Sequence, residues 1–177
     1  GEDAFQRIIK EKHDAKIMFL IQQANIRSSE LKTAKEFNKE LANVNEAANK
    51  KISNIEVSAY ASPDGAYDFN EKLANQREKS SSTFLKKQMK KGKVEQYKDE
   101  NFFKNFVVAE DWDGFKKAME ESNIQDKELI LRVLSMYQDP EQREQEIKNI
   151  SSVYKTLADE ILPQLRRSRL TLNYEII

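Results

Sequence analysis

The alternation of hydrophobic and polar positions changes its period several times along this chain, and residues 55–85 show the clearest change. Residues 55–59 alternate between apolar and polar side chains, which predicts a strand. Residues 62–65 have the sequence Ser-Pro-Asp-Gly, which favours a tight turn. Between 69 and 84, residues of one face recur every three or four positions, which predicts an amphipathic helix. The backbone N–H groups of the helix start would lie beside the end of the strand, where an anionic group could be held.

The segments on either side have patterns of their own. Residues 16–21 form a compact apolar run of strand length, which predicts a central strand buried on both faces. Apolar residues on one face predict a helix from 29 to about 51, with Ser28 and Ser29 as candidate N-caps. Residues 3–14 predict a short lead-in helix or linker. The remaining expected features are a helix end at Gly92, a strand at 102–108, helical segments from 110, from 129 and from an Asp139 N-cap to 163, and a closing strand at 169–176.

Composition and charge exclude several classes of function. The chain has 177 residues, the length of one domain, and 30 basic residues balance 30 acidic ones. A general nucleic-acid-binding protein needs a surplus of cations, so this balance argues against that class. The chain has no cysteine and His13 is its one histidine, which excludes metal sites of the His/Cys kind and nucleophiles activated by histidine. No apolar run approaches the length that spans a bilayer.

The spacing of residues after the predicted strand resembles that of a known family. Its pattern is a strand ending in glycine, an aromatic residue or histidine, threonine and aspartate, followed by a glycine and then by Asn-x-x-Leu-Ser-x-x-Arg. Gly65, Asn70, Leu73 and Arg77 fall at the positions of this pattern without a gap. The family is the C-terminal, peptidoglycan-binding domain of outer-membrane protein A, which peptidoglycan-associated lipoproteins and flagellar motor stators share.

The flanks of the pattern agree with this resemblance. A strand and a long helix precede it, and Arg166 and Arg167 match a paired arginine that leads into an edge strand of the family. The similarity covers about residues 16–108 and 163–175, whereas residues 110–162 look similar to a helical insertion found in a subset of the family.

The patterns and the resemblance together imply a fold, a location and a division of the chain. The expected fold is α/β (α+β), a two-layer sandwich like that of the family, with a mixed sheet of about four strands, helices on one face and a helical insertion at about 110–162. Residues 1–15 would be a lead-in segment and 16–177 the domain. The resemblance implies a place on the periplasmic side of a bacterial outer membrane, with membrane attachment only through parts outside this chain. It implies neither catalysis nor a cofactor.

The resemblance also implies a ligand, the diaminopimelate residue of the peptidoglycan stem peptide. Its free end carries a carboxylate and an ammonium, so a guanidinium and an acid are needed to hold it. The family pattern assigns the guanidinium to Arg77 and the acid to the position that Ser62 occupies. Serine carries no charge, which removes a contact of about 1.5–3 kcal/mol, or about ten- to hundredfold in affinity. Asp64 could replace the acid, or Ser62 could cap the turn in a pocket that has changed or lost its ligand.

Two further residues complete the candidate site. Asn70 either borders the pocket or holds the turn in place by a hydrogen bond from its side chain to the backbone. Arg166 either contributes a second cation or is a surface residue at a strand start. The main hypothesis is therefore a non-catalytic domain that anchors an envelope protein to the cell wall.

Other classes of function remain as alternatives. Asp64, Asp68 and Glu71 could suggest glycoside cleavage, but acids in this region also favour the start of a helix. The insertion could instead form a protein-interaction surface on a fold that has lost peptidoglycan binding, or its large side chains could pack onto the sheet. The residues concerned are Trp112, Phe115, Met119, Met136 and Tyr137.

Overall fold

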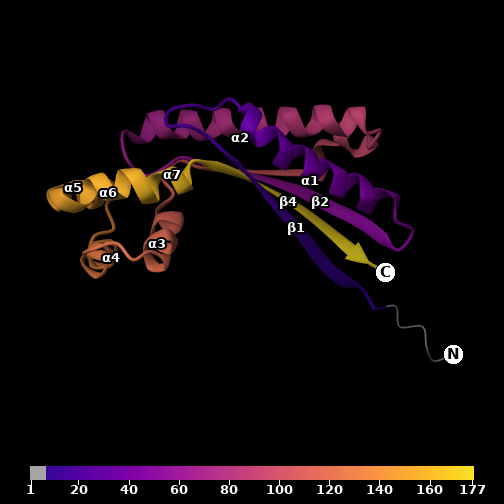
Figure 1. Cartoon of the computed structure of the whole chain (residues 1–177). Helices are drawn as coiled ribbons and strands as arrows, with labels where there is room; N and C mark the ends of the chain where they lie inside the picture. The colour runs from indigo at the N-terminus through magenta and orange to yellow at the C-terminus, as the bar shows by residue number, and fades with distance from the viewer. Residues whose placement is uncertain (1–6) are drawn as a thin grey trace.

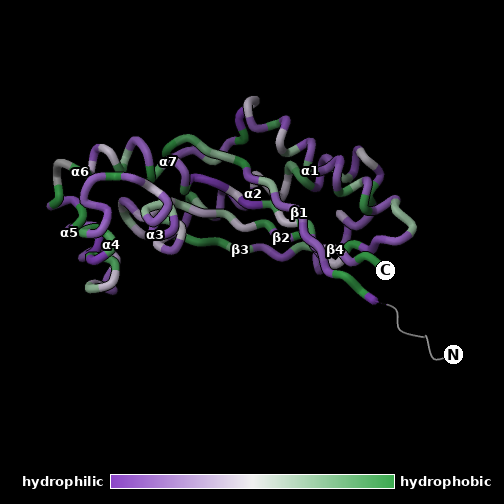
Figure 2. Tube along the Cα trace, turned by 60° about the horizontal axis from the view of Figure 1, so that its bottom comes forward, coloured by the Kyte–Doolittle hydropathy of each residue, from purple (hydrophilic) through white to green (hydrophobic). Residues whose placement is uncertain are grey.

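Four strands form one mixed sheet. The computed structural model describes residues 7–177, the side chains of 151 and 152 excepted. The strands are β1 (Ile9–Met18), β2 (Lys50–Tyr60), β3 (Phe103–Val108) and β4 (Arg167–Ile176), in the spatial order β1-β4-β2-β3. Strand β4 pairs antiparallel with both β1 and β2. Strand β3 pairs parallel with β2, beside which it lies in Figure 2.

Two long helices cover one face of this sheet (Figure 1). They are α1 (Ser28–Glu46) and α2 (Tyr67–Lys91). The core between the layers consists mainly of aliphatic residues and phenylalanines, and α1 contributes Phe37 and Leu41 to it, both fully buried. This arrangement confirms the predicted two-layer sandwich with a mixed sheet and helices on one face.

A group of short helices lies beyond one end of the sheet, far from the C-terminus (Figure 1). The group contains α3 (Trp112–Glu121), α4 (Lys127–Met136), α5 (Pro140–Asn149), α6 (Ser151–Thr156), a π-helical turn (Leu157–Ile161) and α7 (Leu162–Leu165). It has its own hydrophobic core, in which Phe115 and Met119 are buried. Phe115 and Met119 therefore pack within the insertion and not onto the sheet as expected, and Met136 is 64% exposed.

The order of the strands corrects two expectations. The apolar run at 16–21 was expected in the centre of the sheet, but β1 is an edge strand that ends at Met18. The closing strand was expected at an edge, but β4 lies between β1 and β2. Strand β1 also begins at Ile9, so residues 9–15 belong to the sheet and not to a lead-in segment. Its exposed charged side chains obscured the strand in the sequence, and such charges are typical of edge strands. Residues 1–6 of the expected lead-in lie outside the described residues.

Helix boundaries agree with the sequence where a local capping signal is present. Gly92 ends α2, and the Asp139 side chain accepts a hydrogen bond from the Gln142 N–H at the start of α5. Helix α1 ends at Glu46, before the expected 51, because the chain from Lys50 onward pairs with β4. No capping hydrogen bond comes from Ser28 or Ser29, since Arg27 holds the N-cap position of α1.

The last of the expected helices is not continuous. The helix expected from 140 to 163 is interrupted at Ile150, whose ψ of 63° is not helical.

None of the described helices combines the length and the apolar character that crossing a membrane requires.

Candidate functional site

The turn between β2 and α2 is held by side chains on both of its sides. Gly65 has a φ of 92°, which L-residues rarely adopt. The Asn70 side-chain amide donates to the Asp64 carbonyl at 2.9 Å and is buried, which supports its expected role in tying the turn. The Gly65 N–H donates to Oε1 of Glu144 at 3.0 Å, and Glu144 comes from the insertion. The turn is therefore fixed both by its own helix and by α5.

A cavity of about 290 Å³ opens beside this turn. It brings together the loop after β1, the turn, one face of α2 and the start of β4. All five residues that the sequence singled out belong to its lining, which consists of Ile21, Gln22, Ser62, Asp64, Gly65, Ala66, Phe69, Asn70, Leu73, Arg77 and Arg166. The structure thus places the candidate residues at one location, although Ser62 and Arg166 are 104 positions apart in the sequence.

Arg77 does not present its guanidinium in the way that the sequence predicted. The side chain is 0% exposed and donates hydrogen bonds to three backbone carbonyls, those of Leu20, Gln23 and Tyr60, at 2.9–3.2 Å. Its guanidinium also lies over the Phe19 ring, 5.2 Å from the centroid.

The electrostatic surroundings of Arg77 agree with this buried position. Burial, and secondly the charge of Arg166, lower the pKa of Arg77 to about 10. An open two-pronged grip on a ligand carboxylate is therefore not what Arg77 provides here. Instead it joins the loop after β1 to the end of β2.

Arg166 and Asp64 carry the charges that remain available in the cavity. Arg166 is 9% exposed, and no hydrogen bond joins its guanidinium to any residue that the structure describes. Burial lowers the pKa of Arg166, while the Asp64 carboxylate, and then Tyr154, act in the opposite direction. Oδ1 of Asp64 is buried and has no hydrogen-bond partner among the described residues. Such groups cost free energy when they stay unpaired, so this pair of opposite charges suits a ligand that carries both.

Ser62 lines the same cavity as these two groups. It is 9% exposed and lines the cavity, but it contributes no charge. The acid that the family pattern places here is therefore absent, and Asp64 is the carboxylate in the cavity lining.

Glu144 and Tyr154 are parts of the site that the sequence did not reveal. With Asp64 they line a narrow cleft between the turn and the insertion. Glu144 is also paired with Lys148 at 2.8 Å. Glu144 is 79 positions from Gly65 and has no distinguishing spacing within α5, so no sequence signal could have found this contact.

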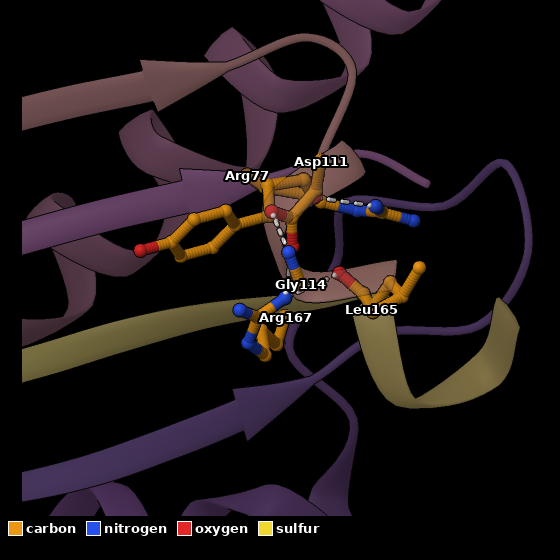
Figure 3. Close-up of polar contacts among 6 residues, drawn as sticks. Arg77, Asp111, Gly114, Leu165 and Arg167 are labelled. Atoms are coloured by element: carbon orange, nitrogen blue, oxygen red, sulfur yellow. Dashed lines mark hydrogen bonds and ion pairs between the residues drawn. The ribbon is translucent and has the colours of Figure 1, made fainter. Parts of the chain in front are cut away.

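A buried ion pair ties the insertion to the sheet (Figure 3). Asp111 caps α3 by accepting from the Gly114 N–H at 2.9 Å, and its other oxygen accepts from Nη1 of Arg167 at 2.7 Å. Nη1 of Arg167 also donates to the Leu165 carbonyl at 3.1 Å. The guanidinium stacks on the ring of Tyr60 at 4.0 Å. The second of the paired arginines thus joins α3, α7 and β2 at one point.

A metal ion has no evident place among the residues described. Residues 7–177, where side chains are given, contain no cluster of three histidine, aspartate or glutamate side chains that could hold one.

Comparisons with known proteins give one kind of match. No family model matches the chain, and no curated protein matches it. Among solved structures, the chain is similar to the OmpA-like domain of FopA1 from Francisella tularensis subsp. tularensis SCHU S4, with 13% identity and a TM-score of 0.45. The match covers 94% of this chain and 73% of that one.

Proposed function

We propose that this chain is a non-catalytic, peptidoglycan-binding domain that anchors an envelope protein to the cell wall on the periplasmic side of an outer membrane. The ligand would be the diaminopimelate of the stem peptide. The observation that carries the proposal is a pair of opposite charges in one cavity, the buried oxygen of Asp64 and the guanidinium of Arg166, which have no hydrogen-bond partner among the described residues. The motif through Gly65, Asn70 and Leu73 supports it.

The roles of the residues differ from the family pattern. Arg166 takes the ligand carboxylate in a two-pronged hydrogen bond, and Asp64 takes the ammonium. Each charge-assisted contact contributes about 1.5–3 kcal/mol. Arg77 supports the cavity wall from behind, because its donors hold the backbone that forms this wall.

Calorimetric titration with the tripeptide Ala-γ-Glu-diaminopimelate tests this proposal. We expect Arg166→Gln and Asp64→Asn each to weaken binding about ten- to hundredfold. The same tripeptide with lysine in place of diaminopimelate lacks the side-chain carboxylate, so it should bind the wild type about as weakly as diaminopimelate binds Arg166→Gln.

The matched control is Arg132→Gln, which removes an exposed arginine from α4, away from the cavity. It should leave binding unchanged. Equal binding of both tripeptides by the wild type, or no binding of either, would reject the proposal.

A protein-interaction module that has lost peptidoglycan binding is the second candidate. The neutral Ser62 and the occupied donors of Arg77 favour it. The surface that it was expected to use is incomplete, because Phe115 is 2% exposed and Met119 is fully buried, while Met136 is 64% exposed. Retention of the wild type on purified sacculi, lost in Arg166→Gln, would decide against this candidate.

A further inference from the structure

A second hollow, of about 140 Å³, lies where the insertion meets the sheet. Its lining shares no residue with the cavity of Asp64 and Arg166. Four cationic side chains and one acidic side chain are among the residues that line it, which are Lys16, Gly114, Lys117, Ala118, Glu121, Gln164, Leu165, Arg167 and Arg169. This local excess of positive charge stands out in a chain whose net charge is zero.

Two of the cations are placed directly opposite each other. Lys16 of β1 and Arg169 of β4 are cross-strand partners in the antiparallel pair. Like charges at such positions destabilise a sheet. Leu170 belongs to the core under α1 and α2, so its neighbour Arg169 faces the other side of the sheet. No ion pair within the described part of the chain involves Lys16, Lys117 or Arg169. Glu121 is the single acidic side chain in this lining, so the hollow keeps an excess of positive charge.

Arg167 gives this hollow a rigid donor. Its side chain is 9% exposed, stacks on Tyr60, and uses Nη1 for both Asp111 and Leu165 (Figure 3). Nε and Nη2 have no hydrogen-bond partner among the described residues. These two nitrogens form the edge with which arginine binds an oxyanion through two parallel hydrogen bonds. The edge is held in place before any ligand arrives, which reduces the entropy lost on binding.

We propose that this hollow binds a phosphate group. A phosphate monoester carries about −1.5 to −2 charges and three acceptor oxygens, which matches several converging cations better than a carboxylate does. One water molecule needs about 10–15 Å³ of such volume. The hollow has about 140 Å³ and therefore has room for a polyatomic anion. The site is independent of peptide binding in the other cavity.

Titration of the whole chain with inorganic phosphate, followed by amide chemical shifts at constant ionic strength, tests this inference. We expect saturable shifts in β4 and α3, and at least about fivefold weaker binding in Arg169→Gln and in Lys117→Gln. These variants are preferred to Arg167→Gln, which would also break the buried pair with Asp111.

Lys104→Gln is the matched control. Lys104 is an exposed lysine of β3, its cross-strand neighbour in β2 is Glu56, and it lies outside the hollow. It should bind phosphate like the wild type. Shifts that do not saturate, or equal weakening in Lys104→Gln and Arg169→Gln, would overturn the inference.

Vesicles identify the source of the phosphate group. If the group belongs to a lipid headgroup, vesicles of phosphatidylglycerol should bind the wild type, but not Arg169→Gln, and vesicles of phosphatidylcholine should bind neither. If the wild type binds inorganic phosphate but neither kind of vesicle, the ligand is a soluble phosphate.

Discussion

At the scale of single residues, Arg77 holds two segments of the backbone together. An arginine has five N–H donors, and here three backbone carbonyls from two segments accept from it. The side chain is fully buried, and its removal would take away three hydrogen bonds that join the loop after β1 to the end of β2. The residue therefore contributes to folding more than to recognition.

We predict that Arg77→Met lowers the free energy of unfolding by about 3–5 kcal/mol, because it removes three hydrogen bonds donated by a buried, charged side chain. Methionine is close in length, which limits the cavity term. Urea denaturation measures the change, with Arg132→Met on the exposed face of α4 as the control that stays within about 0.5 kcal/mol. Equal stability of the two variants would contradict the structural role of Arg77.

At the scale of elements, the N-terminus of α3 is the joint between insertion and sheet. Asp111 caps the helix and pairs with Arg167 at the start of β4, so one carboxylate serves two elements. A Cβ added at Gly114 would lie 2.7 Å from Cγ of Asp111, too close for a real contact. The position therefore needs glycine for space, and not for an unusual backbone conformation.

We predict that Gly114→Ala destabilises the protein by about 1–3 kcal/mol, although alanine normally favours a helix interior, because it displaces the capping carboxylate from Arg167. Gly92→Ala is the matched control. Its φ of −82° suits alanine, and the nearest atom to the added Cβ is 3.4 Å away. Thermal unfolding should separate the two variants, and similar midpoints would show that Asp111 can move at no cost.

At the scale of the whole molecule, the chain folds around two hydrophobic cores. One core lies between the sheet and helices α1 and α2, and the other lies within the insertion. The contacts that join the two parts include the Asp111–Arg167 ion pair, the Gly65–Glu144 hydrogen bond and a backbone hydrogen bond from Asp111 to Ala61. Stability is therefore expected to differ between the two parts.

We predict that native-state hydrogen exchange is faster in α4 and α5 than in β2 and β4, because the insertion can open while the sheet remains intact. The middle of α2, which packs on the sheet, should exchange as slowly as the strands. Mass spectrometry of peptic fragments measures the difference. Equal protection throughout would mean that the two cores unfold as one unit.

Much of the candidate site was accessible from the sequence because its spacing is local. The turn at Gly65 and the tie from Asn70 depend on residues within one strand, turn and helix. The placement of Arg166 came from a resemblance and not from physical spacing. Glu144 could not be predicted, because its contact with the turn arises when an insertion 79 residues away folds back.

What the sequence determined by itself is the set of elements, since side-chain periodicity and turn residues act over a few positions. Helix α2 and strand β3 illustrate this, as both lie close to where their patterns place them. Tertiary structure alone decided that β4 is central, that β1 starts at Ile9 and that Arg77 is sealed by backbone carbonyls. These outcomes depend on pairing between segments far apart in the chain, and such contacts leave no local pattern from which they could be inferred.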